Sequence, residues 1–96
     1  MITGGASGLG RSAASHILGS GGRCVVADLP SQQALAESLL DAHPSAADRL
    51  VFAPCDVTKE EEVQRALDAC RTLEGNPANP NVIVNCAGIG EWVLGV

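Results

Sequence analysis

The amino-acid sequence predicts an α/β domain built on a parallel sheet with helices on both faces. Short β-rich runs alternate along the chain with amphipathic runs of helical periodicity. A glycine-rich turn also separates the first expected strand from the first expected helix. Because strand–helix–strand crossovers are right-handed, the four expected strands form a doubly wound sheet in the order 3-2-1-4.

Four segments have the composition of strands in such a sheet. Residues 1–2 resemble the end of a first strand, and residues 23–28 (RCVVAD) form the second. The third covers residues 49–57 (RLVFAPCDV), where Pro54 lacks a hydrogen-bond donor near the end. The fourth covers residues 81–85 (NVIVN).

Three amphipathic segments lie between these strands. The first begins near residues 7–10 and ends at residues 19–22 (GSGG), a strong helix stop. The second is expected as one helix over residues 31–44. The third opens with TKEE, which predicts a capping box: the Thr58 hydroxyl accepts from the Glu61 amide, and the Glu61 side chain reaches back.

Composition excludes several classes of protein. Apolar residues make up 46% of the 96-residue chain and charged residues 18%, which is too apolar for disorder. No run approaches the roughly 20 apolar residues of a membrane span. The net charge of −5 disfavours nucleic acid and anionic membranes, so neither is expected as a partner. The four cysteines are too far apart for a zinc site, and no metal site is expected.

The strongest chemical signal is residues 3–10 (TGGASGLG), at the opening of the first helix. Without side chains at Gly4, Gly8 and Gly10, a diphosphate can approach the backbone there, since a Cβ would crowd the turn or the phosphate. Unpaired amides and the helix dipole then favour its negative charge. The turn therefore predicts a site for a phosphorylated nucleotide.

The second signal is Asp28, at the end of the second strand and 18 residues after Gly10. A carboxylate at that spacing can accept hydrogen bonds from the adenosine ribose hydroxyls. Ser7 and Leu29, beside the two motifs, are not basic. A 2′-phosphate would thus meet an anion and no cation, which predicts NAD rather than NADP.

Two weaker signals follow the third and fourth strands. Asp56 and Val57 could contact the adenine, although Asp56 could equally belong to the start of the third helix. After the fourth strand, residues 85–88 (NCAG) are small enough for backbone to lie against a cofactor. The Asn85 side chain could also tie neighbouring strands together.

Together these motifs resemble the short-chain dehydrogenase/reductase family. TGGASGLG matches the family pattern TGxxxGxG, and Asp28, the Asp56–Val57 pair and NCAG (for the family's NNAG) follow in the family's order. ITGGASGLG, ADLP, VFAPCDVT and VNCAGI are similar to mitochondrial members that oxidise 3-hydroxyacyl-CoA or hydroxysteroids. The resemblance implies a Rossmann fold that binds NAD. The candidate cofactor-binding residues are Gly4, Ser7, Gly8, Leu9, Gly10, Asp28, Asp56, Val57, Asn85, Cys86, Ala87 and Gly88.

The resemblance also implies hydride transfer between NAD and a hydroxyl or carbonyl of a small-molecule substrate, in a homotetramer. The resemblance implies a mitochondrial location; without it, a cytoplasmic location is expected. In the family a Ser, a Tyr and a Lys four residues after the Tyr perform the chemistry, but this chain has no Tyr, and Lys59 matches no catalytic position. We therefore expect residues 1–96 to be the N-terminal dinucleotide-binding part of one Rossmann domain, truncated at both ends, without catalytic residues and inactive alone.

Three alternatives remain at this point. Residues 5–12 (GASGLGRS) nearly match the P-loop pattern GxxxxGK[ST], but Arg11 stands in place of the Lys and is not its equivalent. Arg11 is instead expected to face solvent or, at most, a phosphate. The second alternative is an S-adenosylmethionine-dependent methyltransferase, which also has a glycine-rich turn and an acidic strand end. The NCAG motif fits neither a P-loop protein nor a methyltransferase. The third alternative is a non-catalytic NAD-binding module.

Overall fold

The computed structural model describes residues 1–74 and 83–86 of the chain. In this part, one parallel sheet has the strand order β3-β2-β1-β4, which confirms the predicted order. β1 lies between β2 and β4, with Ile2 opposite Val26 on one side and Val84 on the other. The strands are β1 (Ile2–Thr3), β2 (Cys24–Asp28), β3 (Leu50–Pro54) and β4 (Val84–Asn85).

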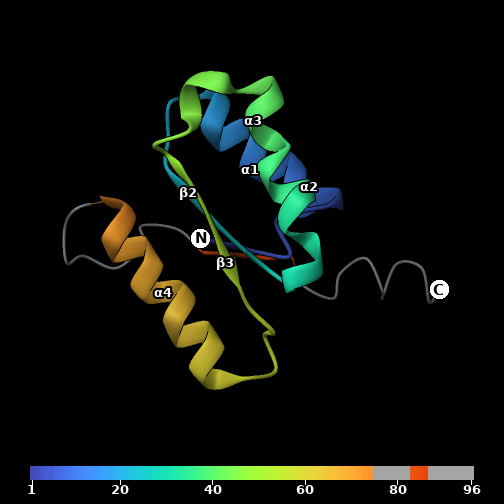
Figure 1. Cartoon of the computed structure of the whole chain (residues 1–96), viewed down its shortest axis with the longest axis vertical. Helices are drawn as coiled ribbons and strands as arrows, with labels where there is room; N and C mark the ends of the chain where they lie inside the picture. The colour runs from blue at the N-terminus through green and yellow to red at the C-terminus, as the bar shows by residue number, and fades with distance from the viewer. Residues whose placement is uncertain (75–82, 87–96) are drawn as a thin grey trace.

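Helices cover both faces of the sheet, as Figure 1 shows: α1, α2 and α3 lie on one face and α4 on the other. The helical segments are α1 (Gly8–Gly19), η1 (Pro30–Gln32), α2 (Gln33–Glu37), α3 (Leu39–Ala42), η2 (Pro44–Ala46) and α4 (Glu60–Glu74). None of the helices in residues 1–74 and 83–86 has the length and apolar character needed to cross a membrane.

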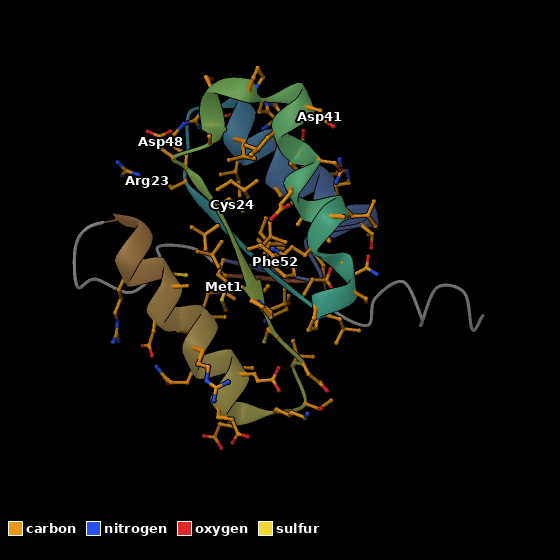
Figure 2. The ribbon with its side chains drawn as sticks, in the orientation of Figure 1. Met1, Arg23, Cys24, Asp41, Asp48 and Phe52 are labelled. Atoms are coloured by element: carbon orange, nitrogen blue, oxygen red, sulfur yellow. The ribbon has the colours of Figure 1, made fainter. Side chains whose placement is uncertain are left out.

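The two core layers follow from the alternation of side chains along β2. Cys24 and Val26 face the cluster that contains α1 and α3, whose neighbours include the half-buried Phe52 (Figure 2). Val25 and Ala27 face the opposite cluster with α4. All four of these β2 side chains are buried, which explains why the strand reads as a continuous apolar run.

The third predicted strand is longer than the observed one. β3 ends at Pro54, and the amide of Cys55 makes a last hydrogen bond to the Asp28 carbonyl at 2.8 Å. Beyond it, the Asp56 carboxylate binds the amide of Thr58 and turns the chain. The prediction that the strand continues to residue 57 is therefore wrong. Of the fourth predicted strand, residues 81 and 82 lie outside the described residues.

The first helix ends where the sequence predicts. α1 stops at Gly19, and the Gly22 amide bonds back to the Ile17 carbonyl at 2.9 Å. Gly21 makes this reversal with φ of +87°, a conformation that favours glycine.

The second predicted helix is not continuous, and the break falls at Ser38, between α2 and α3. In an unbroken helix the Leu35 carbonyl would accept from the amide four residues later. Here that carbonyl accepts from the Ser38 hydroxyl at 2.6 Å and from the Arg11 guanidinium. The prediction of one helix over residues 31–44 is thus wrong, because two side chains bind the carbonyl that would continue it.

The predicted capping box at the third helix also involves the wrong residues. α4 begins at Glu60, and the Thr58 hydroxyl donates to Asp56 Oδ1 at 2.7 Å. The carboxylate that reaches back is Glu62, whose Oε1 accepts from the Asp56 amide at 2.9 Å. The predicted contact between Thr58 and Glu61 is therefore replaced by a turn ahead of the helix, in which the Asp56 carboxylate accepts from Thr58.

Candidate dinucleotide-binding site

The candidate site lies at the carboxyl ends of the strands. The chain passes from β1 to β2 and β3 on one side, while β4 pairs with the other side of β1. In doubly wound sheets, a reversal of this kind leaves a crevice beyond the strand ends, where ligands bind. The turn after β1 and the first residues of α1 lie at this point.

The glycines of the turn have distinct structural roles. Gly4 and Gly8 have φ of +65° and +56°, a region that glycine enters at little cost. A Cβ on Gly8 would meet no atom within 4 Å, so open space lies before this residue. A Cβ on Gly10, in contrast, would lie 2.2 Å from the Gly4 carbonyl oxygen. Gly8 leaves room for a ligand, whereas Gly10 lets the helix pack on the turn.

The N-terminus of α1 has the properties of an anion site. Ser7 is the N-cap, but its side chain makes no capping hydrogen bond, and no acidic residue lies in the first turn. The first amides of a helix have no partner within the helix, and the dipole adds partial positive charge. Leu9, whose side chain is 68% exposed, offers an apolar surface beside them. A diphosphate therefore fits the residues present.

Asp28 lies next to this turn and binds it directly. Its Oδ2 accepts from the Ala6 amide at 3.1 Å, and its Oδ1 accepts from the Leu29 amide at 2.8 Å. An ionised carboxylate has about four acceptor positions, so two remain for the hydroxyls of a ribose. The predicted ribose-binding and phosphate-binding groups are thus brought together, and they meet at Ala6.

Asp56 and Val57 lie at the same edge, after β3. Hydrogen bonds from the Thr58 hydroxyl and amide, at 2.7 and 2.9 Å, lower the pKa of the Asp56 carboxyl. Asp56 thus takes part in the turn before α4, as the simpler interpretation expected. Val57 is 45% exposed and presents an apolar side chain at the surface. Contact of either residue with adenine stays a prediction.

The fourth motif joins β4 to the centre of the sheet. The Thr3 hydroxyl donates to Asn85 Oδ1 at 3.3 Å, and the Cys86 amide bonds to the Thr3 carbonyl at 3.0 Å. The prediction that Asn85 ties neighbouring strands is thus confirmed. The predicted residues Ala87 and Gly88 lie outside the described residues. Sequence reasoning missed the role of Thr3, although a polar residue in a buried strand signals the need for a partner.

Arg11 does not behave as the sequence predicts. Its Nη2 donates to the Ser38 hydroxyl at 2.9 Å, and its Nη1 contacts the carbonyls of Leu35 and, at 3.5 Å, Ala6. The expectation that Arg11 faces solvent is therefore wrong, because three protein acceptors surround the half-buried guanidinium, and contact with a phosphate stays a prediction. This arrangement also differs from that of a P-loop lysine, which reaches the phosphates themselves.

Metal-ligating side chains are scattered over the described part of the chain. No group of three or more His, Cys, Asp or Glu side chains among these residues could hold a metal ion. None of the four cysteines, all of which lie in the described residues, forms a disulfide; Cys24, Cys55 and Cys70 are buried, and Cys86 is half-buried. Burial raises the pKa of the Cys24 thiol to about 11, so at neutral pH this group stays protonated.

A parallel sheet in the order 3-2-1-4, helices on both faces and a glycine-rich turn at the switch point define a Rossmann-type α/β domain. The family model of the short chain dehydrogenases matches residues 1–94. The chain therefore belongs to the short-chain dehydrogenase family.

Individual relatives are similar to most of this chain. The human 3-hydroxyacyl-CoA dehydrogenase type-2 is 42% identical over 89 residues, which cover 93% of this chain and 31% of the relative. The Drosophila melanogaster protein of the same name is 39% identical over 95 residues, 97% of this chain and 33% of the relative. The L-2,3-butanediol dehydrogenase of Corynebacterium glutamicum is 36% identical over 92 residues, 95% and 34% of the two chains. This chain thus spans about a third of the length of these curated relatives.

Proposed function

We propose that this chain is the NAD-binding part of a short-chain oxidoreductase. One observation carries the proposal: the Asp28 carboxylate binds the Ala6 amide at 3.1 Å, inside the glycine-rich turn. That contact supports the proposal because it joins the carboxylate proposed for the ribose to the turn proposed for the diphosphate. In the whole enzyme, a bound NAD would supply the hydride acceptor for oxidation of an alcohol, and a bound NADH would supply the hydride donor for reduction of a carbonyl.

The preference for NAD over NADP follows from charge. Asp28 carries a negative charge where the 2′-oxygen of the adenosine ribose would lie, and the neighbouring Leu29 is neutral. Arg11, the cation nearest in sequence to the turn, is bound to Ser38 and to two carbonyls. A 2′-phosphate would therefore be repelled by Asp28 without compensation from Arg11.

The proposed substrates are 3-hydroxyacyl-CoA thioesters or hydroxysteroids. Several relatives are named 3-hydroxyacyl-CoA dehydrogenase type-2, and one from Eggerthella lenta, 35% identical, is named 3beta-hydroxysteroid dehydrogenase 2. A mitochondrial location and a homotetramer, both implied by the family resemblance, are part of the same proposal.

Within these residues, the proposed work of the chain is binding and orientation. The turn and α1 hold the diphosphate, Asp28 holds the ribose, and the apolar Leu9 and Val57 exclude water beside them. The sequence has no tyrosine, so the acid/base group that the resemblance implies is not among its 96 residues. We therefore propose that the isolated chain binds NAD but does not catalyse hydride transfer. A non-catalytic NAD-binding module would behave in the same way.

Calorimetric titration with NAD and NADP tests the proposal. The wild-type chain should bind NAD more tightly than NADP. Asp28→Ala should weaken NAD binding and reduce the difference between the NAD and NADP affinities. Asp48→Ala is the matched control, since Asp48 is exposed and precedes β3, at the opposite end of the sheet (Figure 2). Equal binding of NAD and NADP by the wild type would refute the role of Asp28, and no binding of either would refute the function.

Whether the protein is an enzyme is tested separately. The chain is incubated with NAD and a 3-hydroxyacyl-CoA, and NADH formation is followed by absorbance. The expected result is NAD binding without NADH formation. NADH formation by these 96 residues would contradict the proposal that they bind NAD without catalysing the reaction.

A further inference from the structure

The peptide unit of Ala6 is held from both sides by charged side chains. Its amide donates to Asp28 Oδ2 at 3.1 Å, and its carbonyl accepts from Arg11 Nη1 at 3.5 Å. Ala6 is fully buried, so water on the side of its methyl group does not compete for these two hydrogen bonds. The middle of the glycine-rich turn is therefore fixed by one anion and one cation, which come from β2 and α1.

Arg11 connects this turn to the helices that follow β2. Its Nη2 donates to the Ser38 hydroxyl at 2.9 Å, and its Nη1 also donates to the Leu35 carbonyl. The Ser38 hydroxyl in turn donates to the same Leu35 carbonyl at 2.6 Å. The planar guanidinium thus joins three acceptors from two separate parts of the chain, a geometry that the single ammonium of lysine does not reproduce.

The charge of Arg11 is also not paired. Among the described residues, its acceptors are two carbonyls and one hydroxyl, and no carboxylate forms an ion pair with it. A half-buried guanidinium in the first turn of α1 that is bound only to neutral groups is held by the geometry of its hydrogen bonds and not by an ion pair.

We propose that Arg11 is a positioning residue for the dinucleotide site. It fixes the Ala6 peptide, and with it the conformation of the turn from Gly4 to Gly8, without touching the cofactor. Because Asp28 holds the same peptide from the other side, the two residues act together on the diphosphate site. This inference rests on the proposed NAD-binding function and adds to it a residue that neither the glycine pattern nor the acidic strand end contains.

The test compares wild-type chain with Arg11→Met, Arg11→Lys and the control Arg65→Met, an exposed arginine on α4. NAD, ADP and adenosine are titrated into each variant, because only NAD and ADP carry the diphosphate. Arg11→Met should weaken NAD and ADP about tenfold, as expected for loss of a hydrogen-bonded charged group. Adenosine affinity should change less than about twofold, and Arg65→Met should leave all three affinities unchanged.

Amide hydrogen exchange provides a readout that does not depend on a ligand. In Arg11→Met the Ala6 amide should exchange faster, while the amide of the buried Leu18 in α1 keeps its protection. Arg11→Lys should recover only part of both effects. Full recovery by lysine would mean that charge alone matters, and it would overturn the positioning role.

The remaining outcomes are also decisive. Equal NAD affinity of Arg11→Met and wild type would refute the inference while leaving the proposed function intact. Equal weakening of adenosine and ADP would indicate a general structural effect and would likewise refute it. If the wild-type chain bound no NAD, the proposed function itself would be refuted. If the exchange rate of the Ala6 amide were unchanged in Arg11→Met, the contact between Arg11 and Ala6 would not fix the turn, and the inference would be refuted.

Discussion

Gly8 and Gly10 belong to one motif, but the structure predicts different consequences for stability and for NAD binding when each is replaced by alanine. At Gly10 a new Cβ would lie 2.2 Å from the Gly4 carbonyl oxygen and 2.9 Å from the Gly5 Cα. Both are backbone atoms, so α1 or the turn must move. Overpacking of this kind costs about 1–3 kcal/mol, and contact with backbone places Gly10→Ala at the upper end of that range, roughly 3 kcal/mol.

At Gly8 a new Cβ would meet nothing within 4 Å, so the only cost is the positive φ of +56°. That conformation costs an L-residue about 1–2 kcal/mol, which the lower entropy of the unfolded chain offsets by about 0.4–1 kcal/mol. Gly8→Ala should therefore lower the free energy of unfolding by only about 1 kcal/mol. Its methyl group, however, would occupy the space assigned to the diphosphate.

Urea denaturation and NAD titration on both variants measure the two effects. Gly10→Ala should unfold at a clearly lower urea concentration than Gly8→Ala. Gly8→Ala should bind NAD at least about tenfold more weakly than the wild type, although it is more stable than Gly10→Ala. The reasoning is refuted if Gly10→Ala is as stable as the wild type, or if Gly8→Ala binds NAD with undiminished affinity.

Two further predictions concern titratable groups. Hydrogen bonds from Thr58 lower the pKa of Asp56 below its ordinary value of 3.8, so its stabilising contribution is present above that value and is lost as the pH falls through the lowered pKa. Asp56→Ala should reduce the loss of urea resistance on acidification, and an unchanged pH dependence would contradict this. Burial raises the pKa of Cys24 to about 11, so iodoacetamide at about pH 8 should label the half-buried Cys86 first, as followed by mass spectrometry. Labelling of both thiols at one rate in the folded chain would disprove the argument.

The features that the sequence predicted correctly depend on local patterns. The alternation of strands and helices, with the handedness of crossovers, was enough for the strand order. The glycine stop after α1 and the tie between Asn85 and its neighbouring strand also follow from residue type and position. Each of these predictions uses either nearby residues or a rule that holds for nearly all parallel sheets.

The features that the sequence missed depend on contacts between distant residues. The interruption at Ser38 arises because Arg11, from α1, binds the Leu35 carbonyl. The spacing of apolar residues along the chain does not reveal a contact of this kind. The start of α4 differs from the prediction because Thr58 belongs to a turn around the Asp56 carboxylate, and the helix begins only at Glu60. The acceptors of Arg11 could not be predicted either, because Leu35 and Ser38 lie more than 20 residues further along the chain.

The double engagement of Asp28 has a consequence for protein engineering. Replacing the acidic residue at the end of β2 is an obvious route to a coenzyme with an extra phosphate. In this chain, that exchange would also leave the buried Ala6 amide without its acceptor, which costs about 1–3 kcal/mol. A redesign for NADP therefore needs two elements at once: a cation for the added phosphate and a replacement acceptor, such as a hydroxyl, for the turn.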